Sequence, residues 1–137
     1  MPGLEDVVDH RARIAGFFDR FGRERNLNLP PLSADGVGSI QRGSAVVSIH
    51  VLADKNILLL LSRIAKQPEL DATRAKKLLA ASFLETGDAA FAIHPQTGDL
   101  YLRILRGLDG LDYDEFEDLV HSIAQTADLW DDRVGEL

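Results

Sequence analysis

The spacing of hydrophobic residues divides the chain into segments typical of helices and segments typical of strands. Apolar residues recur every three or four positions, as on one face of a helix, over residues 4–24, 70–85 and 112–132. In five shorter segments they alternate or run together as in strands, over residues 37–42, 45–52, 57–65, 89–94 and 100–105. The pattern predicts an α+β fold with the order α-β-β-β-α-β-β-α, in which helices flank a twisted antiparallel sheet.

The last two strands form a hairpin with a recognisable turn. Pro95 fixes its own φ and Gly98 accepts a positive φ, as such a turn requires. The helix before the hairpin is predicted to end at Gly87, in the left-handed conformation that closes many helices. Ala90 and Ala92 leave one face of the first hairpin strand flat, which favours close approach by another backbone, including that of a second copy of the chain.

Capping signals mark the starts of the second and third helices. Asp71 is the predicted N-cap of the second helix. Asp112 and Glu115 have the spacing of a capping box at the start of the third helix. Leu111 and Phe116 stand at the positions of a hydrophobic staple around the same helix start.

Two segments carry more apolar surface than one core face needs. The strand at residues 57–65 is apolar on both sides, and such strands are normally covered on both sides. We therefore expect helices on one face of the sheet and a partner, either a second subunit or a client, on the other. The first helix carries Phe17, Phe18 and Phe21 on a wide stripe, which is either a core-facing surface or a binding surface.

Composition and charge narrow the class of protein. The 137 residues suit one domain spanning residues 1–137. A net charge of −7 argues against nucleic acid and anionic membranes as partners. No apolar run approaches the ~18 to 20 residues of a membrane span, and the N-terminal residues lack signal-peptide features, so we expect a cytoplasmic protein. The chain has no Cys, which excludes disulfides and thiol catalysis.

The residue pattern predicts no catalytic residue, metal site or cofactor. The four histidines lie on different predicted elements and form no i, i+4 zinc pair; they are His10, His50, His94 and His121. The acidic residues within 109–118 lack the EF-hand order and suit the first turn of a helix. No Gly-x-Ser-x-Gly elbow or P-loop is present. Taken alone, the residues therefore indicate a protein-binding dimer rather than an enzyme.

Four short motifs, in this order and spacing, resemble the class I type III secretion chaperones of the Tir chaperone family over nearly the whole chain. They are Asp35-Gly36-Val37-Gly38-Ser39-Ile40, Ala81-Ser82-Phe83-Leu84, His94-Pro95-Gln96-Thr97-Gly98, and Leu108-Asp109-Gly110-Leu111-Asp112 before a helix that ends near Trp130. Gly38 departs from the family pattern, where a larger residue, often Cys, is common. Ala81-Ser82-Phe83 replaces the more common Ala-Asn-Phe.

The resemblance implies a bacterial, cytoplasmic homodimer without ATPase activity. Such a chaperone holds the N-terminal region of a secreted effector partly unfolded and presents it to the secretion apparatus, with the secretion ATPase as a further partner. Effector binding is implied at the first helix and the sheet edge, at Ile14, Phe17, Phe18, Phe21, Val37 and Ile40. The implied dimer interface lies on the second helix and the next strand, at Leu78, Leu79, Phe83, Ala90, Phe91 and Ala92.

Two other functions remain open from the sequence. One is a regulatory protein-binding module on the same scaffold, whose partner is an anti-activator or another chaperone. The other is a small enzyme or ligand-binding domain, which would place His50 or His94 in a polar pocket beside a carboxylate.

Overall fold

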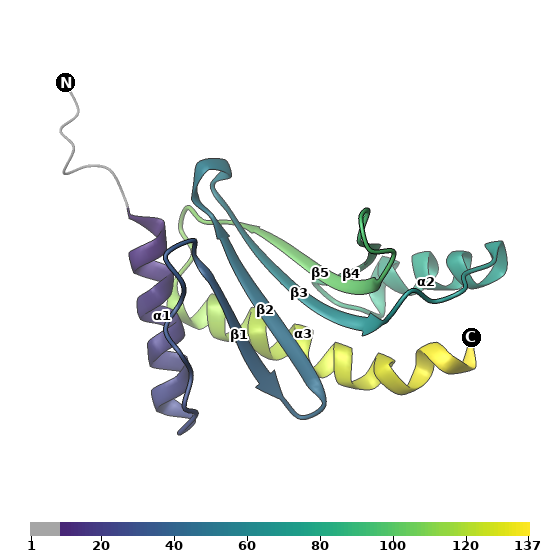
Figure 1. Ribbon diagram of the computed structural model, residues 1–137, viewed down its shortest axis with the longest axis horizontal. Coiled ribbons are helices and arrows are strands. Elements are labelled where there is room, and N and C mark those ends of the chain that lie inside the picture. The colour runs from purple at the N-terminus through teal and green to yellow at the C-terminus, as the bar shows by residue number, and fades with distance from the viewer. Residues whose placement is uncertain (1–8) are drawn as a thin grey trace.

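The computed structural model describes residues 9–137 and has the predicted order of helices and strands (Figure 1). The elements are α1 (His10–Glu24), β1 (Val37–Arg42), β2 (Ala45–Leu52), η2 (Ala53–Lys55), β3 (Ile57–Ala65), α2 (Ala72–Leu84), β4 (Ala90–Ile93), β5 (Leu100–Gly107), α3 (Tyr113–Arg133) and η3 (Val134–Glu136). The predicted bounds of the first three strands are confirmed. The part of the first predicted helix at residues 4–8 lies outside the described residues.

The five strands form one antiparallel sheet in the order β1-β2-β3-β5-β4. One face of this sheet packs against α3, which contacts β2, β3 and β5. In Figure 1 the strands pass in front of α3, while α1 stands beside β1 and α2 lies at the β4 end. The outer strands of the sheet are therefore β1 and β4.

Burial alternates along the strands, so that one face of the sheet forms the core. A row across the strands runs through Ile40, Val47, Ser62 and Leu102, which are paired in register and all buried. Ser62 is the polar member of this row, and its hydroxyl donates to the Val46 carbonyl at 3.0 Å. The hydrogen bond offsets the cost of burying the hydroxyl group.

The first helix packs its apolar stripe into this core and is tied to α3 by polar contacts. Ile14, Phe18 and Phe21 are fully buried. The side chain of Glu24 accepts a hydrogen bond from the Tyr113 hydroxyl at 2.7 Å. Because this hydrogen bond favours the charged carboxylate, the pKa of Glu24 is lowered. Of the two alternatives open for the phenylalanine stripe, the core-facing one holds for Phe18 and Phe21.

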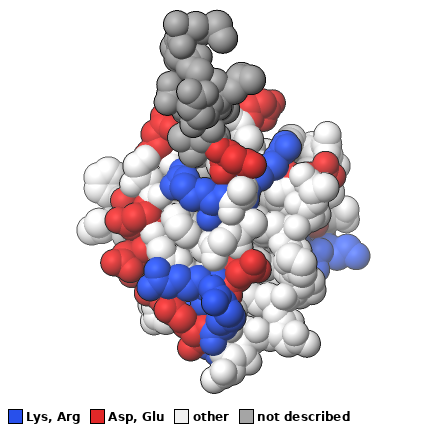
Figure 2. Space-filling model, turned by 90° about the vertical axis from the view of Figure 1, so that its left-hand side faces the viewer, with Lys and Arg blue, Asp and Glu red and all other residues white. Residues whose placement is uncertain are grey.

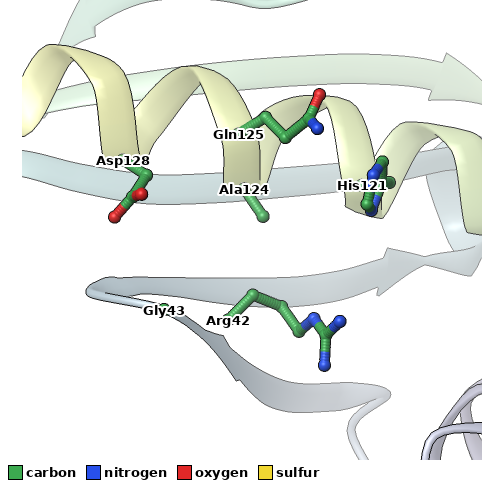
Figure 3. A pocket seen from close by; sticks show the side chains of 6 residues that line it. All are labelled: Arg42, Gly43, His121, Ala124, Gln125 and Asp128. Carbon is green, nitrogen blue, oxygen red and sulfur yellow. The ribbon is translucent and has the colours of Figure 1, made fainter.

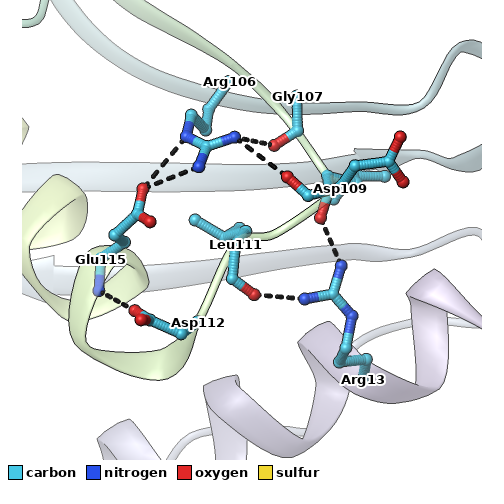
Figure 4. Close-up of polar contacts among 8 residues, drawn as sticks. Arg13, Arg106, Gly107, Asp109, Leu111, Asp112 and Glu115 are labelled. Atoms are coloured by element: carbon cyan, nitrogen blue, oxygen red, sulfur yellow. Dashed lines mark hydrogen bonds and ion pairs between the residues drawn. The ribbon is translucent and has the colours of Figure 1, made fainter.

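The loop before α3 is held from two sides by arginine side chains (Figure 4). Arg13 reaches from α1 and donates to the backbone carbonyls of Leu108 and Leu111. Arg106 at the end of β5 donates to the Glu115 carboxylate at 3.1 and 2.8 Å. These contacts fix the position from which α3 crosses the sheet.

The predicted helix caps form, with one difference. Asp71 accepts from the Arg74 N–H at 2.8 Å, and Asp112 accepts from the Glu115 N–H at 2.8 Å. The Glu115 carboxylate binds Arg106 instead of returning to the N-cap, so only one half of the capping box forms. An arginine competes successfully because a charged donor makes the stronger hydrogen bond.

The hairpin turn forms at its predicted place, but the helix before it ends earlier than predicted. Gly98 has φ 77°, and its N–H donates to the His94 carbonyl at 2.9 Å. Gly87 also has a positive φ, of 61°, but α2 ends three residues before it at Leu84. A turn fills the gap, closed by the bond from the Gly87 N–H to the Leu84 carbonyl.

Candidate protein-binding surfaces

One group of exposed apolar side chains lies on α2. Phe83 is 91% exposed, Leu84 78% and Leu79 68%. Ile93 on the neighbouring strand β4 is also exposed. Exposed large apolar side chains that lie close together are typical of a surface that binds another protein.

A hollow of about 220 Å³ lies where α2 meets β4. Leu78 and Phe91 line it together with the exposed Leu79 and Ile93. Phe91 also packs edge-on against Trp130 of α3, with the ring centroids 5.0 Å apart. Phe91 therefore supports the fold of one chain as well as lining this surface.

The outer edge of β4 is occupied by side chains of the α2 segment. The Phe91 N–H donates to the Ser82 hydroxyl at 3.0 Å, and the Thr86 hydroxyl donates to the Ala89 carbonyl at 2.5 Å. These backbone groups would otherwise be available to pair with another strand. The edge of β4 is thus partly closed to strand addition.

The second exposed surface is the sheet face opposite α3, which we call the open face. By the register it carries side chains from β2, β3 and β5, among them Val46, Leu59, Leu61, Arg63, Tyr101, Arg103 and Leu105. Val46 is 51% exposed and Leu105 48%. Strand β3 is therefore apolar on both sides, as predicted, with α3 covering one side only.

Two hollows flank Tyr101 on the open face. One of about 390 Å³ is lined by Val46, Ser48 and Leu61, among others. The other, of about 260 Å³, lies on the β4 side and is lined mainly by aliphatic side chains, including Leu59 and Leu61. Hollows of this size can receive individual side chains of a bound segment.

The edge of β1 is open over two residues. The Val51 N–H donates to the Gly36 carbonyl at 2.8 Å, and the antiparallel alternation then directs the N–H and C=O groups of Val37, Ser39 and Gln41 away from β2. Ser33 uses both groups of Val37, through bonds of 3.1 and 2.9 Å. Ser39 and Gln41 remain as the positions where an added strand can pair.

A polar hollow of about 200 Å³ lies between the β1–β2 hairpin and α3 (Figure 3). Arg42 and Gly43 come from the hairpin, and His121, Gln125 and Asp128 come from the helix. The Asp128 carboxylate accepts hydrogen bonds from Ser44, which tie the hairpin to α3. The acidic side chain thus has a structural role at this place.

The histidines considered for a polar site are bound to other groups. His50 contacts the Ser48 hydroxyl at 3.1 Å, and burial lowers its pKa. His94 Nδ1 accepts from the backbone N–H groups of Gln96 and Thr97. Within residues 9–137 neither histidine forms an ion pair with a carboxylate.

Two further features of residues 9–137 bear on the class of protein. Their His, Asp and Glu side chains form no group of three that could hold a metal ion. The helices within this part of the chain are all too short or too polar to cross a membrane.

A sequence model of the Tir chaperone protein (CesT) family matches residues 18–131, which is most of the chain. The chain belongs to the Tir chaperone family. This confirms the family resemblance drawn from the four motifs and, with it, the prediction of a type III secretion chaperone. Among curated protein sequences, none matches this family member significantly.

Solved structures of similar fold are chaperone–effector and related complexes. A chain of the ExsC-ExsE complex superposes with a TM-score of 0.75 at 19% identity, covering 90% of this chain and 95% of that one. A chain of the HopA1-SchA chaperone–effector complex gives 0.72 at 12% identity, covering 92% and 98%. A chain of the ExoT-SpcS complex from Pseudomonas aeruginosa gives 0.63 at 20% identity, covering 90% and 99%. The fold of this Tir chaperone family member is therefore that of these proteins.

Four of the six residues expected to contact an effector are core residues in this family member. The side chains of Ile14, Phe18, Phe21 and Ile40 have no exposed surface, so they cannot touch a partner in this structure. The outer side of α1 is instead polar, and Figure 2 shows basic and acidic side chains interspersed on that side of the molecule. A helical stripe identifies a buried face, and here the core buries Ile14, Phe18 and Phe21 completely and Phe17 in part.

The other expected site residues keep at least part of their surface. Phe17 is half-buried against the rings of Tyr113 and Phe116, with centroids 5.9 and 5.8 Å away. Val37 is 40% exposed at the start of β1. In the expected dimer set Leu78 is buried, while Leu79 and Phe83 are exposed and the three β4 residues, Ala90, Phe91 and Ala92, are half-buried.

Reasoning from the sequence did not assign residues to the open face. The signal was present, because the two-sided apolar character of residues 57–65 indicated a partner on one face of the sheet. The sequence could not show which strands lie beside this strand in the sheet. The register now adds Val46 from β2, and Tyr101 and Leu105 from β5.

Proposed function

We propose that this protein acts as a cytoplasmic homodimer that binds the N-terminal region of a secreted effector and keeps it partly unfolded and soluble for secretion. The observation that carries the proposal is the open face, an apolar sheet surface in reach of a strand edge that is free at Ser39 and Gln41. A segment without its own fold needs both features. It must bury its apolar side chains and satisfy its backbone groups.

Binding a flexible segment on such a surface has a large free-energy cost. Ordering a flexible segment costs on the order of 2 to 5 kcal/mol or more, so many contacts are required. The two hollows beside Tyr101 give pockets for side chains, and the β1 edge gives backbone hydrogen bonds. Two copies of the chain would present this surface twice, which increases the contact with one effector.

The dimer interface is proposed on α2 and β4. Leu79, Phe83 and Leu84 form the most exposed apolar group on this helix, and covering them is favourable by about 25 cal/mol per Å² of apolar surface. Ser82 and Thr86 close part of the β4 edge. The two copies are therefore proposed to join through side-chain packing rather than through a continuous sheet.

The site residues supply binding rather than chemistry. The open face consists mainly of aliphatic and aromatic side chains, so a cofactor or catalytic step forms no part of the proposal. Release of the effector is proposed to occur at the secretion apparatus, with the secretion ATPase as the receiving partner.

The test is capture of the natural client. The tagged chain is expressed in its own bacterium, and proteins that co-purify with it are identified and subjected to limited proteolysis. We expect a secreted protein whose protected region lies near its N-terminus and whose secretion falls when the chaperone gene is deleted. Size-exclusion chromatography with light scattering should give two copies of the chain per complex.

Two results would change the proposal. A captured partner that is never secreted would favour the regulatory module on the same scaffold. A chain that captures no protein and remains a monomer would remove the chaperone function. A variant with Val46→Asp and Leu61→Asp serves as the internal comparison, because it places charge on the open face without touching α2.

A further inference from the structure

We infer that the effector segment bound on the open face carries carboxylate side chains between its apolar ones. The inference rests on the proposed function and concerns the charge of the client. The chain has 22 Asp and Glu residues against 15 Lys and Arg, yet none of the residues in the five strands is acidic. The strands carry instead four arginines, at Arg42, Arg63, Arg103 and Arg106.

Two of these arginines belong to the open face. Arg63 pairs in register with Tyr101, and Arg103 with Leu61, and all four follow the side-chain alternation of that face. The other two arginines are engaged on the opposite side. Arg106 binds Glu115 at 2.8 Å, and Arg42 faces the polar hollow beside α3.

The two open-face arginines differ in what already neutralises them. Arg63 lies 3.7 Å from the carboxylate of Asp99, which is largely buried. Arg103 is exposed, and it takes part in none of the ion pairs within residues 9–137. A carboxylate brought by a partner would therefore find its strongest attraction at Arg103.

The hollow beside Arg103 has the matching chemistry. Its walls are mainly aliphatic, with Leu59 and Leu61 on one side and Ala92 on the other, and no carboxylate lines it. His94 also lines it, and because His94 Nδ1 accepts two backbone N–H groups, its ring hydrogen is on Nε2. An apolar side chain in the hollow would thus have N–H donors beside it for an acidic neighbour.

The net charge of the molecule predicts the opposite preference. A charge of −7 attracts basic segments at long range. At contact, however, the charged groups nearest to the segment determine the binding preference, and a lysine placed beside Arg103 would be repelled by its like charge. The preference between an acidic and a basic segment therefore separates local recognition from long-range attraction.

The experiment compares two synthetic peptides of equal length, in which Leu and Val alternate with Glu in one and with Lys in the other. Binding of each labelled peptide to the full chain is measured by fluorescence anisotropy. We expect about fivefold or tighter binding of the Glu peptide at low salt, and a smaller difference at high salt because ions screen exposed charges.

Three variants locate the effect. Arg103→Glu should abolish the preference for the Glu peptide, and Arg103→Gln should reduce it. Lys55→Glu makes the same charge change in the exposed turn between β2 and β3, and it should leave the preference in place. Circular dichroism verifies that each variant is folded.

Equal binding of the two peptides, tighter binding of the Lys peptide, or binding of neither overturns the inference. If Arg103→Glu alters the oligomeric state but not peptide binding, the open face belongs to a second copy of the chain, which also overturns it. Capture of a secreted effector that is unaffected by Arg103→Glu would leave the chaperone function standing and remove only the acidic preference. Capture of no secreted protein would remove the function itself.

Discussion

The Ser82 hydroxyl on α2 accepts a hydrogen bond from the backbone N–H of Phe91 in β4, at 3.0 Å. The same hydroxyl donates to the Leu78 carbonyl one helical turn earlier, at 2.9 Å. One small side chain thus connects the helix to the edge strand. It also accepts a hydrogen bond from an N–H group that would otherwise be free to pair with another strand. Ser82 is also the position at which the chain departs from the more common Ala-Asn-Phe motif.

We expect Ser82→Ala to destabilise the chain, because the Phe91 N–H loses its acceptor at a partly buried place. The expected loss in the free energy of unfolding is about 1 kcal/mol, measured by urea denaturation. Thr126→Ala is the matched control, because the Thr126 hydroxyl makes the same bond to a carbonyl four residues earlier without reaching another element. Equal losses in the two variants would show that the link to β4 contributes nothing.

Phe83→Asp should separate the proposed dimer without unfolding the chain. Its side chain is 91% exposed, so the single chain loses little by the change, whereas an interface would have to bury a carboxylate without a partner. Light scattering should report the mass of one chain, and circular dichroism an unchanged fold. Leu129→Asp on α3 changes another exposed apolar residue and should preserve the dimer.

Phe91→Asp is a weaker test of the same interface. Phe91 packs against Trp130, so this change would also damage the single chain. A Phe83→Asp protein that remains a dimer would place the interface elsewhere.

The sequence predicts the elements of this fold well because each has its own local signal. The first three strands are short segments bounded by turns, and Asp71 and Asp112 cap the helices that they precede. Which of the expected site residues are buried in the core and which are exposed was harder to predict. Phe17 and Phe18 are adjacent on one stripe, and only the tertiary packing, with Phe17 beside α3 and Phe18 beside β1, makes one half-buried and the other fully buried.

Gly38 is a second example of a feature that the local sequence pattern does not predict. The sequence shows that a small residue replaces a larger one in the family, but the reason lies in a loop without periodicity. A Cβ at Gly38 would lie 2.4 Å from Leu32 Cδ2 and 3.0 Å from Phe18 Cζ. The loop leucine thus occupies the space that a larger side chain would need.

We therefore expect Gly38→Ala to lower the free energy of unfolding by about 1 to 3 kcal/mol through overpacking. In the Leu32→Ala background the same change should cost clearly less, because the nearest obstructing atom is gone. A double-mutant cycle measures this coupling, expected at about 0.5 kcal/mol or more. Additive effects would mean that Leu32 does not limit the space at Gly38.

The titration of His50 should make stability fall in mild acid. Burial disfavours the charged imidazole, so the folded-state pKa of His50 lies below its ordinary value of 6.5. The unfolded chain then binds the proton more readily. The contribution is fully present above pH 6.5 and is lost as the pH falls from there through the folded pKa.

Urea denaturation at a series of pH values tests the assignment. His50→Gln should flatten the pH dependence in this window, because glutamine does not titrate. His121→Gln removes an exposed histidine on α3 and serves as the comparison. An unchanged pH profile in His50→Gln would assign the acid sensitivity to other groups.

Phe17 and Phe18 should separate the two roles that the sequence could not divide. Phe18 is fully buried, so Phe18→Ala should cost about 3 to 5 kcal/mol and leave little folded protein to bind any client. Phe17 is only half-buried, in contact with the rings of Tyr113 and Phe116, so Phe17→Ala should cost roughly half as much. Measured on folded protein, effector capture by the Phe17→Ala variant then tells whether the exposed part of this ring belongs to the binding surface. Unchanged capture would confine that surface to the sheet, and a Phe18→Ala protein as stable as the parent would contradict the burial on which this division depends.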